Sequence, residues 1–223
     1  MIENLESILV RFDNLNNAGR YQEVLADVEP LLSQQENTEL YLVKANAQYG
    51  IGDLDGALKS LEKAIVANPD HVGARSNYGS VLFAMGRYVD GLNACDSALY
   101  IGGGFAPAYV NAAHCLAALG YIDLATEYLQ QAVEQNPEDV SIMQTAALMM
   151  AEMDLYDLAR DMFMQAARTR GGPDSIHEQI ADFFATARRK GIDRTKVISD
   201  VNAWRDEFAK KPDVFRLSAD LLG

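Results

Sequence analysis

The sequence predicts an all-α protein, an α-solenoid of helical hairpins that follow one another along the chain. Three observations support this fold class. Residues of one kind recur every 34 positions, apolar residues follow the helical spacing of three and four, and glycine or proline closes most of the expected helices. We therefore expect about five hairpins followed by a C-terminal helical cap.

The period is clearest in the expected turns between helices. Gly52, Gly86 and Gly120 are separated by 34 residues each, and Asp154 holds the next position of the series. Small residues recur with the same period five and twelve positions after each turn. The two series are Ala57, Gly91, Ala125, Ala159 and Ala64, Ala98, Ala132, Ala166. Independent columns that share one period indicate a structural repeat.

Each 34-residue unit predicts two helices joined by a short turn. The units begin at Thr38, Val72, Ala106 and Val140. Apolar or small residues occupy most of positions 4, 7, 8 and 11 of a unit, which form one face of a first helix. The same spacing returns after the turn. Alanine or glycine at positions 8, 20 and 27 should let the helix axes approach closely.

This pattern resembles the tetratricopeptide repeat (TPR) family. The units Thr38–His71 and Ala106–Asp139 match it best, and a degenerate unit begins at Leu5. The resemblance covers residues 5–173. It implies a right-handed solenoid whose first helices line a concave groove, and it implies protein or peptide binding without naming any chemistry.

Two further units match this family with departures. Val72–Phe105 has Gly103 where the closing proline is usual, and Val140–Pro173 has Asp154 where the turn glycine is usual. We expect both to be hairpins of the same array, which would then occupy residues 1–173.

The last fifty residues, 174–223, leave the repeat pattern. Asp174–Arg189 and residues 193–210 keep helical spacing, and Pro212 should begin a last short helix. Residues 1–173 hold 10 basic and 23 acidic residues, whereas 174–223 hold nine of each. We expect this region to be a helical cap that covers the open end of the array. The alternative is a dimerisation or docking surface centred on Trp204.

Composition excludes several classes of protein. The net charge of −13 gives no electrostatic basis for binding nucleic acid or anionic membranes. Residues 97–122 contain no charged side chain, but Gly102–Gly104 and Pro107 interrupt any membrane helix there. Two cysteines cannot form a disulfide framework, so we expect a cytoplasmic protein.

No motif in the sequence predicts an enzyme, a metal site or a cofactor. His71, His114 and His177 lie in different units without ligand spacing. Cys95 and Cys115 form no CxxC motif and are expected to be small core residues. We expect no catalytic residue and no cofactor.

Helical geometry indicates which side chains would line the groove. If positions 4, 7, 8 and 11 of a first helix face the core, then positions 2, 6, 9 and 13 face away, with 5 and 12 beside them. The candidate groove residues are Asn46, Tyr49, Ser76, Asn77, Ser80, Phe83, Val110, Asn111, His114, Gln144 and Leu148. Each could equally be a solvent-facing residue without a role.

The chemistry of these residues indicates the kind of partner. Asn77 and Asn111 share one column, and both should be exposed amides able to bind an extended peptide backbone. None of the candidates is Lys or Arg, whereas TPR proteins that clamp acidic chaperone tails place cations there. We expect a neutral, apolar or basic partner segment.

Three functions remain open from the sequence. The first is a non-catalytic adaptor that binds a partner segment in the groove, with a self-assembling scaffold as a variant. The second is a secretion chaperone, because Ala112–Gly120 resembles the third repeat of type III secretion translocator chaperones. The third is an enzyme whose activity lies in 174–223, a segment too short for a separate catalytic core.

Overall fold

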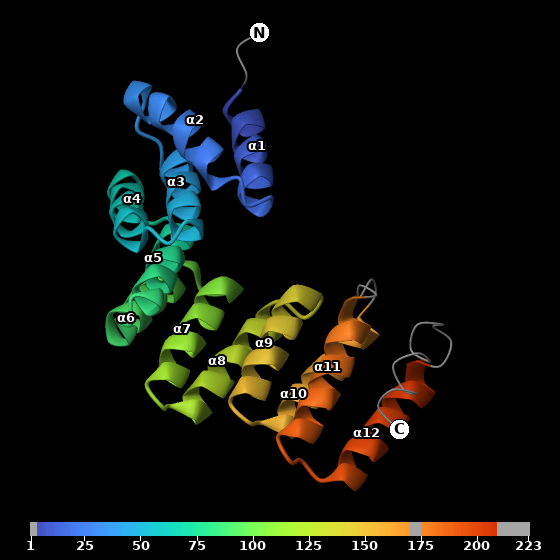
Figure 1. Ribbon diagram of the computed structural model, residues 1–223. Coiled ribbons are helices and arrows are strands. Elements are labelled where there is room, and N and C mark those ends of the chain that lie inside the picture. Colours follow the sequence, from blue (N-terminus) through green and yellow to red (C-terminus); the bar gives the residue numbers. More distant parts are fainter. Residues whose placement is uncertain (1–3, 170–174, 209–223) are drawn as a thin grey trace. The chain divides into compact units, whose positions relative to one another are not determined.

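A computed structural model of the chain describes residues 4–169 and 175–208 (Figure 1). The described residues form helices, turns and short connections, with no β-strand. The helices are α1 (Leu5–Asn17), α2 (Tyr21–Gln34), α3 (Thr38–Gly50), α4 (Leu54–Ala67), α5 (Val72–Ala84), α6 (Tyr88–Gly102), α7 (Ala106–Ala118), α8 (Ile122–Gln135), α9 (Val140–Glu152), α10 (Tyr156–Arg168), α11 (Ser175–Arg189) and α12 (Arg194–Phe208). The prediction of an all-α fold of sequential helical hairpins is confirmed.

The repeat period fixes where the helices begin. The first helices α3, α5, α7 and α9 start at the predicted unit starts. The second helices α4, α6, α8 and α10 each start two residues after the turn column. The degenerate unit also folds as a hairpin, α1–α2, in which Phe12 is fully buried.

The residues of the turn column have a left-handed backbone conformation. Gly52, Gly86 and Gly120 have φ of 81°, 76° and 84°, and Asp154 has φ of 62°. Side chains with a Cβ are strained in this region, which is why glycine recurs here. Asp is one of the few other residues that tolerate it.

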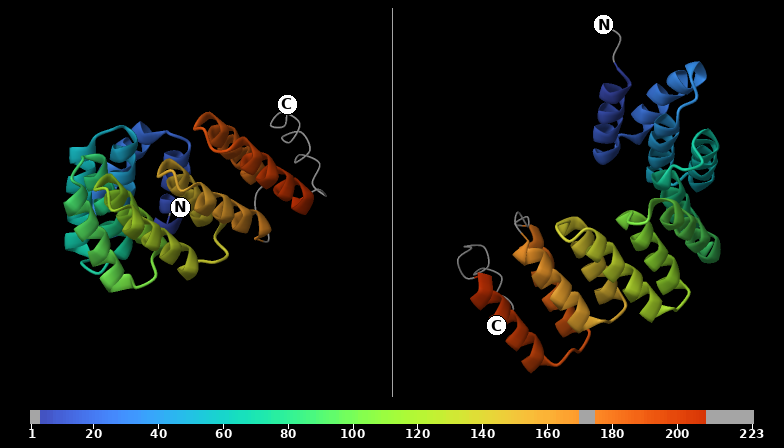
Figure 2. Two further views of the ribbon diagram at one scale, coloured as in Figure 1. Left: turned by 90° about the horizontal axis from the view of Figure 1, so that it is seen from below. Right: turned by 180° about the vertical axis from the view of Figure 1, so that it is seen from behind.

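The chain divides into two compact units, unit 1 (Met1–Ala132) and unit 2 (Val133–Gly223). The predicted boundary between the array and the cap, at residues 173 and 174, stays a prediction. In unit 2, α9, α10, α11 and α12 lie side by side in chain order (Figure 2). The short helix expected from Pro212 lies outside the described residues.

The core of unit 1 combines large aliphatic side chains with columns of small residues. Ala57 and Ala64 of α4 are fully buried, as the close approach of helix axes requires. The two helices α5 and α6 also approach closely. A Cβ on Gly79 would collide with Cys95 Sγ and lie 2.9 Å from the Gly91 carbonyl oxygen. The predicted role of positions 8 and 20 is confirmed in this hairpin.

The core of unit 2 is built from methionine and aromatic side chains. Met143 and Met150 are fully buried, and the Phe183 ring lies 5.3 Å from Phe163. Trp204 of α12 is only 1% exposed, and its ring lies beside that of Phe208 in the same helix. A side chain buried in its own unit cannot be the centre of an exposed docking surface, so that alternative for Trp204 is wrong. Val197 and Val201 are buried together with Trp204, which shows that this stripe of α12 faces the core of unit 2.

Candidate functional site

The first helices of unit 1 bring most of the predicted groove residues to one face. We call this set the first-helix face of unit 1, and it comprises Asn46, Tyr49, Asn77, Ser80, Phe83, Val110, Asn111 and His114. All are exposed or half-buried, and Tyr49 is 45% exposed. Side-chain contacts link neighbouring helices across this face, from α3 to α5 and from α5 to α7. Partly covered polar and aromatic side chains on adjacent helices are typical of a surface that receives a ligand.

The asparagine column is engaged within the protein. Asn111 Nδ2 donates to the backbone oxygen of Ser76 at 3.2 Å and to its Oγ at 3.1 Å. Asn77 Nδ2 donates to Asn46 Oδ1 at 3.3 Å. Both asparagines are therefore half-buried, not exposed as predicted. Each amide oxygen is still an acceptor for a ligand.

Ser76 is a second correction to the predicted groove. Its exposed fraction is 0%, so it cannot line an open surface. The reason is the hairpin that follows, whose Asn111 covers Ser76 and bonds to its hydroxyl. Ser76 positions Asn111 and does not itself face a ligand.

Aromatic rings give the first-helix face of unit 1 its apolar part. The Phe83 ring centroid lies 5.6 Å from Tyr88 and 5.4 Å from His114. His114 Nδ1 lies 3.0 Å from the Val110 carbonyl oxygen. A carbonyl oxygen only accepts, so Nδ1 donates the proton and Nε2 of the neutral ring is left as an acceptor.

Unit 2 carries a hollow on its own first-helix face. A cavity of about 490 Å³ opens between α9 and α11. Leu148, a predicted groove residue, lines it and is 46% exposed. The other lining residues are Ala151, Glu152, Gln179, Asp182, Phe183, Thr186 and Lys190. Most of the exposed area of this lining is apolar, and Lys190 Nζ donates to Asp154 Oδ1 at 2.6 Å.

Two glutamines on this face hold buried atoms without partners. Gln144 Nε2 and Gln179 Oε1 are buried, and neither forms a hydrogen bond within the described parts of the chain. An unsatisfied buried donor or acceptor costs free energy and needs an explanation, such as a ligand or a water molecule. Gln144 was predicted from the sequence.

The contribution of α11 was missed by sequence reasoning, although a signal exists. Gln179 follows Asn77, Asn111 and Thr145 at steps of 34, so it continues this column of polar residues. Residues 174–223 were predicted to be a cap outside the repeat array, because Gly191 arrives three residues later than the turn glycine of a sixth unit. The structure shows that this glycine still closes a hairpin, with φ of 83° between α11 and α12.

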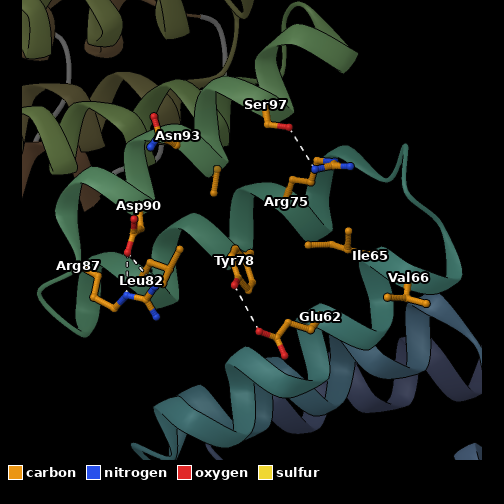
Figure 3. A pocket seen from close by; sticks show the side chains of 11 residues that line it. Glu62, Ile65, Val66, Arg75, Tyr78, Leu82, Arg87, Asp90, Asn93 and Ser97 are labelled. Carbon is orange, nitrogen blue, oxygen red and sulfur yellow. Dashed lines mark hydrogen bonds and ion pairs between the residues drawn. The ribbon is translucent and has the colours of Figure 1, made fainter.

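A second cavity, which the sequence did not indicate, lies on the other side of the unit 1 hairpins. We call it the second-helix cavity, and α4, α5 and α6 surround its volume of about 540 Å³ (Figure 3). Its lining residues are Glu62, Ile65, Val66, Arg75, Tyr78, Leu82, Arg87, Asp90, Asn93, Ala94 and Ser97. Figure 3 shows Arg75 and Arg87 toward opposite ends, with Tyr78 between them.

The remaining chemistry-bearing residues form no reactive site in the described ranges. Burial raises the pKa of Cys115 to about 11 and raises that of Cys95 further, so both thiols are protonated near neutral pH. His71 accepts from the Ala74 backbone through Nδ1 and contacts Glu39 at 3.0 Å, so it serves as a helix cap. Among residues 4–169 and 175–208, no group of three His, Cys, Asp or Glu side chains could hold a metal. The side chain of His177 lies outside the described residues.

No helix in the described segments is long and apolar enough to cross a membrane. The charge-free stretch at residues 97–122 is divided between α6, α7 and the beginning of α8.

The family comparisons agree with the geometry. Two models described as tetratricopeptide repeat match residues 42–109 and 106–139. Neither describes an enzyme. The search of curated proteins gives no significant match.

Solved structures of low sequence identity share the fold. A thermophilic TPR protein of Thermus thermophilus has a TM-score of 0.70 at 20% identity, covering 79% of this chain and 97% of that chain. PilF of Pseudomonas aeruginosa has a TM-score of 0.64 at 13% identity, covering 96% of both chains. A chain of the APC/C hetero-tetramer Cut9–Hcn1 has a TM-score of 0.65 at 16% identity, covering 98% of this chain and 43% of that chain.

Proposed function

Because the chain is a tetratricopeptide repeat protein, we propose that it is a non-catalytic scaffold or adaptor that binds a segment of a partner protein on its first-helix faces. TPR proteins bind protein partners, and one similar structure is a hetero-tetramer. The fold alone names no partner. The surfaces of the two units supply the more specific argument.

The unpaired glutamine atoms of unit 2 carry the proposal. A polypeptide backbone offers one N–H donor and one carbonyl acceptor per residue. Gln179 Oε1 would accept from such an N–H, and Gln144 Nε2 would donate to such a carbonyl. The apolar lining beside them, Leu148 and Phe183, would receive an aliphatic or aromatic side chain of the same segment.

Charge favours a neutral, apolar or basic segment on these faces. The first-helix face of unit 1 contains no Lys or Arg. In unit 2, Glu152 and Asp182 line the cavity while the ammonium of Lys190 is paired with Asp154. An acidic tail would meet like charge without a cation to receive it.

A reducing compartment such as the cytoplasm suits this protein. Cys95 and Cys115 are buried free thiols in helices of unit 1. A thiol core of this kind is compatible with an environment that keeps cysteine reduced.

A matched pair of leucine variants tests the proposal. Leu148→Lys places a cation at the mouth of the unit 2 cavity, whereas Leu158→Lys makes the same change on α10, where the leucine is 38% exposed and lines no cavity described above. Wild type and both variants would be used for affinity capture from the source cell, with mass spectrometry of the bound proteins. Capture that is lost only with Leu148→Lys is the expected result.

The other outcomes have equally definite meanings. Equal capture by all three proteins would refute binding at the unit 2 face. A self-assembling scaffold would instead give only the chain itself and a higher mass in sedimentation. Co-purification of one membrane-active translocator would favour a secretion chaperone.

A further inference from the structure

The second-helix cavity of unit 1 has an apolar interior and a charged border. Ile65, Leu82 and Ala94 are half-buried or buried and form the apolar part. Val66 continues this surface outward, since it lines the cavity and is 81% exposed. A volume of about 540 Å³ is within the range of pockets that hold a ligand.

The cations of this part of the chain are concentrated at the cavity. Between residues 72 and 159 the only Lys or Arg residues are Arg75 and Arg87, and both line it. The chain as a whole carries a net charge of −13. With Arg75 and Arg87 against Glu62 and Asp90, the lining of this cavity is neutral within an acidic protein.

Some N–H donors of the Arg75 guanidinium form no hydrogen bond within the described part of the protein. Its Nε donates to the Pro69 carbonyl at 2.8 Å and its Nη1 to Ser97 Oγ at 3.1 Å. Both partners are neutral, and no carboxylate in the described residues pairs with this guanidinium. Arginine has five N–H donors, so three are left for a ligand on a side chain whose orientation is already fixed.

The two acidic side chains at the cavity already have donors within the protein. Arg87 forms an ion pair with Asp90 at 2.7 Å, and the Tyr78 hydroxyl donates to Glu62 at 3.4 Å. Each acidic side chain thus has a donor within the protein (Figure 3). Of the two cations that line the cavity, Arg75 is the one that forms no ion pair with a carboxylate of the described residues.

We propose that the second-helix cavity binds a segment of a partner protein that presents an aliphatic or aromatic side chain next to a carboxylate. The apolar side chain enters between Ile65, Leu82 and Ala94, and the carboxylate accepts from Arg75. A hydrogen bond to a charged group in a partly covered site is among the stronger polar contacts. The exposed Val66 extends the contact along the partner chain. This surface therefore selects acidic and apolar segments, whereas the first-helix faces favour neutral or basic ones.

A random dodecapeptide library displayed on phage tests this selection without assuming a partner. The library is selected on the full-length protein, with Arg75→Gln used for counter-selection. Peptides that carry Asp or Glu beside Leu, Ile or Phe should be enriched. Absence of any enriched peptide, or enrichment of peptides without a carboxylate, contradicts the proposal.

Fluorescence anisotropy of the enriched peptides then locates the site. Arg75→Gln should weaken binding by about tenfold or more, and Arg75→Lys should weaken it less because it keeps the charge but loses the planar fork. Val66→Glu should weaken binding and Val66→Lys should strengthen it. Val66 is exposed, so neither substitution should affect folding. The two Val66 variants therefore still test the site if Arg75→Gln proves unstable.

Two controls separate this site from the rest of the molecule. Val10→Glu places the same charge on an exposed valine of α1 and should leave the affinity unchanged. Leu148→Lys, the variant that tests the unit 2 face, should also leave it unchanged. Loss of binding with Leu148→Lys, or retention with both Arg75→Gln and Val66→Glu, overturns the assignment.

Discussion

The hairpins α5–α6 of unit 1 and α9–α10 of unit 2 follow one 34-residue plan but are held together by different means. At positions 8 and 20, α5–α6 has Gly79 and Gly91, and the two backbones approach closely. At the same positions α9–α10 has Ala147 and Ala159, with bulky side chains such as Phe163 filling the core.

Ion pairs show a second difference between the two hairpins. The α10 helix is tied to α12 by three ion pairs, which join Arg160 to Asp200, Arg168 to Glu207 and Lys196 to Asp157. The ion pair of α5–α6, Arg87 with Asp90, is local to the start of α6. The repeat pattern therefore fixes the geometry of a hairpin but leaves open which interactions stabilise it.

The largest expected effect is in the close contact of α5 with α6. Gly79→Ala should destabilise the protein by about 2 kcal/mol, because the new methyl group collides with Cys95 Sγ and approaches a backbone oxygen that cannot move away. Urea denaturation followed by circular dichroism measures the change. The reverse substitution Ala147→Gly is the control and should cost about 1–2 kcal/mol, from helix propensity and from the loss of a buried methyl group. If Gly79→Ala stabilises the protein instead, the close approach is wrong.

The next effect is in the network between α10 and α12. Asp200 accepts from the Tyr156 hydroxyl at 2.9 Å and from Arg160 at 3.2 Å. Burial and the bond to Asp200 both raise the pKa of Tyr156, which keeps the donor protonated. Asp200→Ala should cost about 1.5 kcal/mol in the free energy of unfolding, because it leaves the Tyr156 hydroxyl without an acceptor and removes one of the three carboxylates that pair with Arg160. For comparison, Asp182→Ala removes an exposed pair with Arg189 at 3.7 Å and should change stability by less than about 0.5 kcal/mol.

A smaller effect is expected from exchanging the turn residues of the two hairpins. Gly86→Asp should destabilise by about 1 kcal/mol, since φ of 76° disfavours any side chain. Asp154→Gly should stabilise by less than about 1 kcal/mol, because relief of the left-handed backbone is partly offset by loss of the Lys190 ion pair. Thermal melting of the two variants measures the sign of each change in stability. Two shifts of the same sign would show that the turn column is not the cause.

The smallest effect is the pH dependence of the ion pairs between α10 and α12. Hydrogen bonds from Arg168 and Lys196 hold the pKa values of Glu207 and Asp157 below their ordinary values of 4.5 and 3.8. Groups with a lowered pKa in the folded state contribute stability near neutral pH and lose it as acid protonates them. Because both pairs are exposed, the loss should be under about 1 kcal/mol.

Amide hydrogen exchange checks this pH dependence. Exchange in α12, corrected for the intrinsic rate, should become faster as the pH falls from about 5 to about 3. High salt at neutral pH should act in the same direction, since exposed ion pairs are screened. Unchanged protection of α12 in acid would mean that its apolar stripe alone holds it in place.

The sequence by itself determined the helices, their boundaries and the turns. These features are local: a 34-residue period, a 3-to-4 apolar spacing and a residue that tolerates positive φ specify where a helix starts, which face it buries and where it stops. They placed the starts of α3, α5, α7 and α9, and the buried stripe of α12.

Only the tertiary structure decided which side chains of a first helix are accessible. Ser76 and Asn111 belong to adjacent columns of adjacent hairpins, and their hydrogen bond buries the first and half-buries the second. The second-helix cavity depends in the same way on α4, α5 and α6 together. Helical periodicity gives the direction of a side chain from its own axis, but burial is set by atoms of the neighbouring hairpin some 34 residues away, and no local pattern contains them.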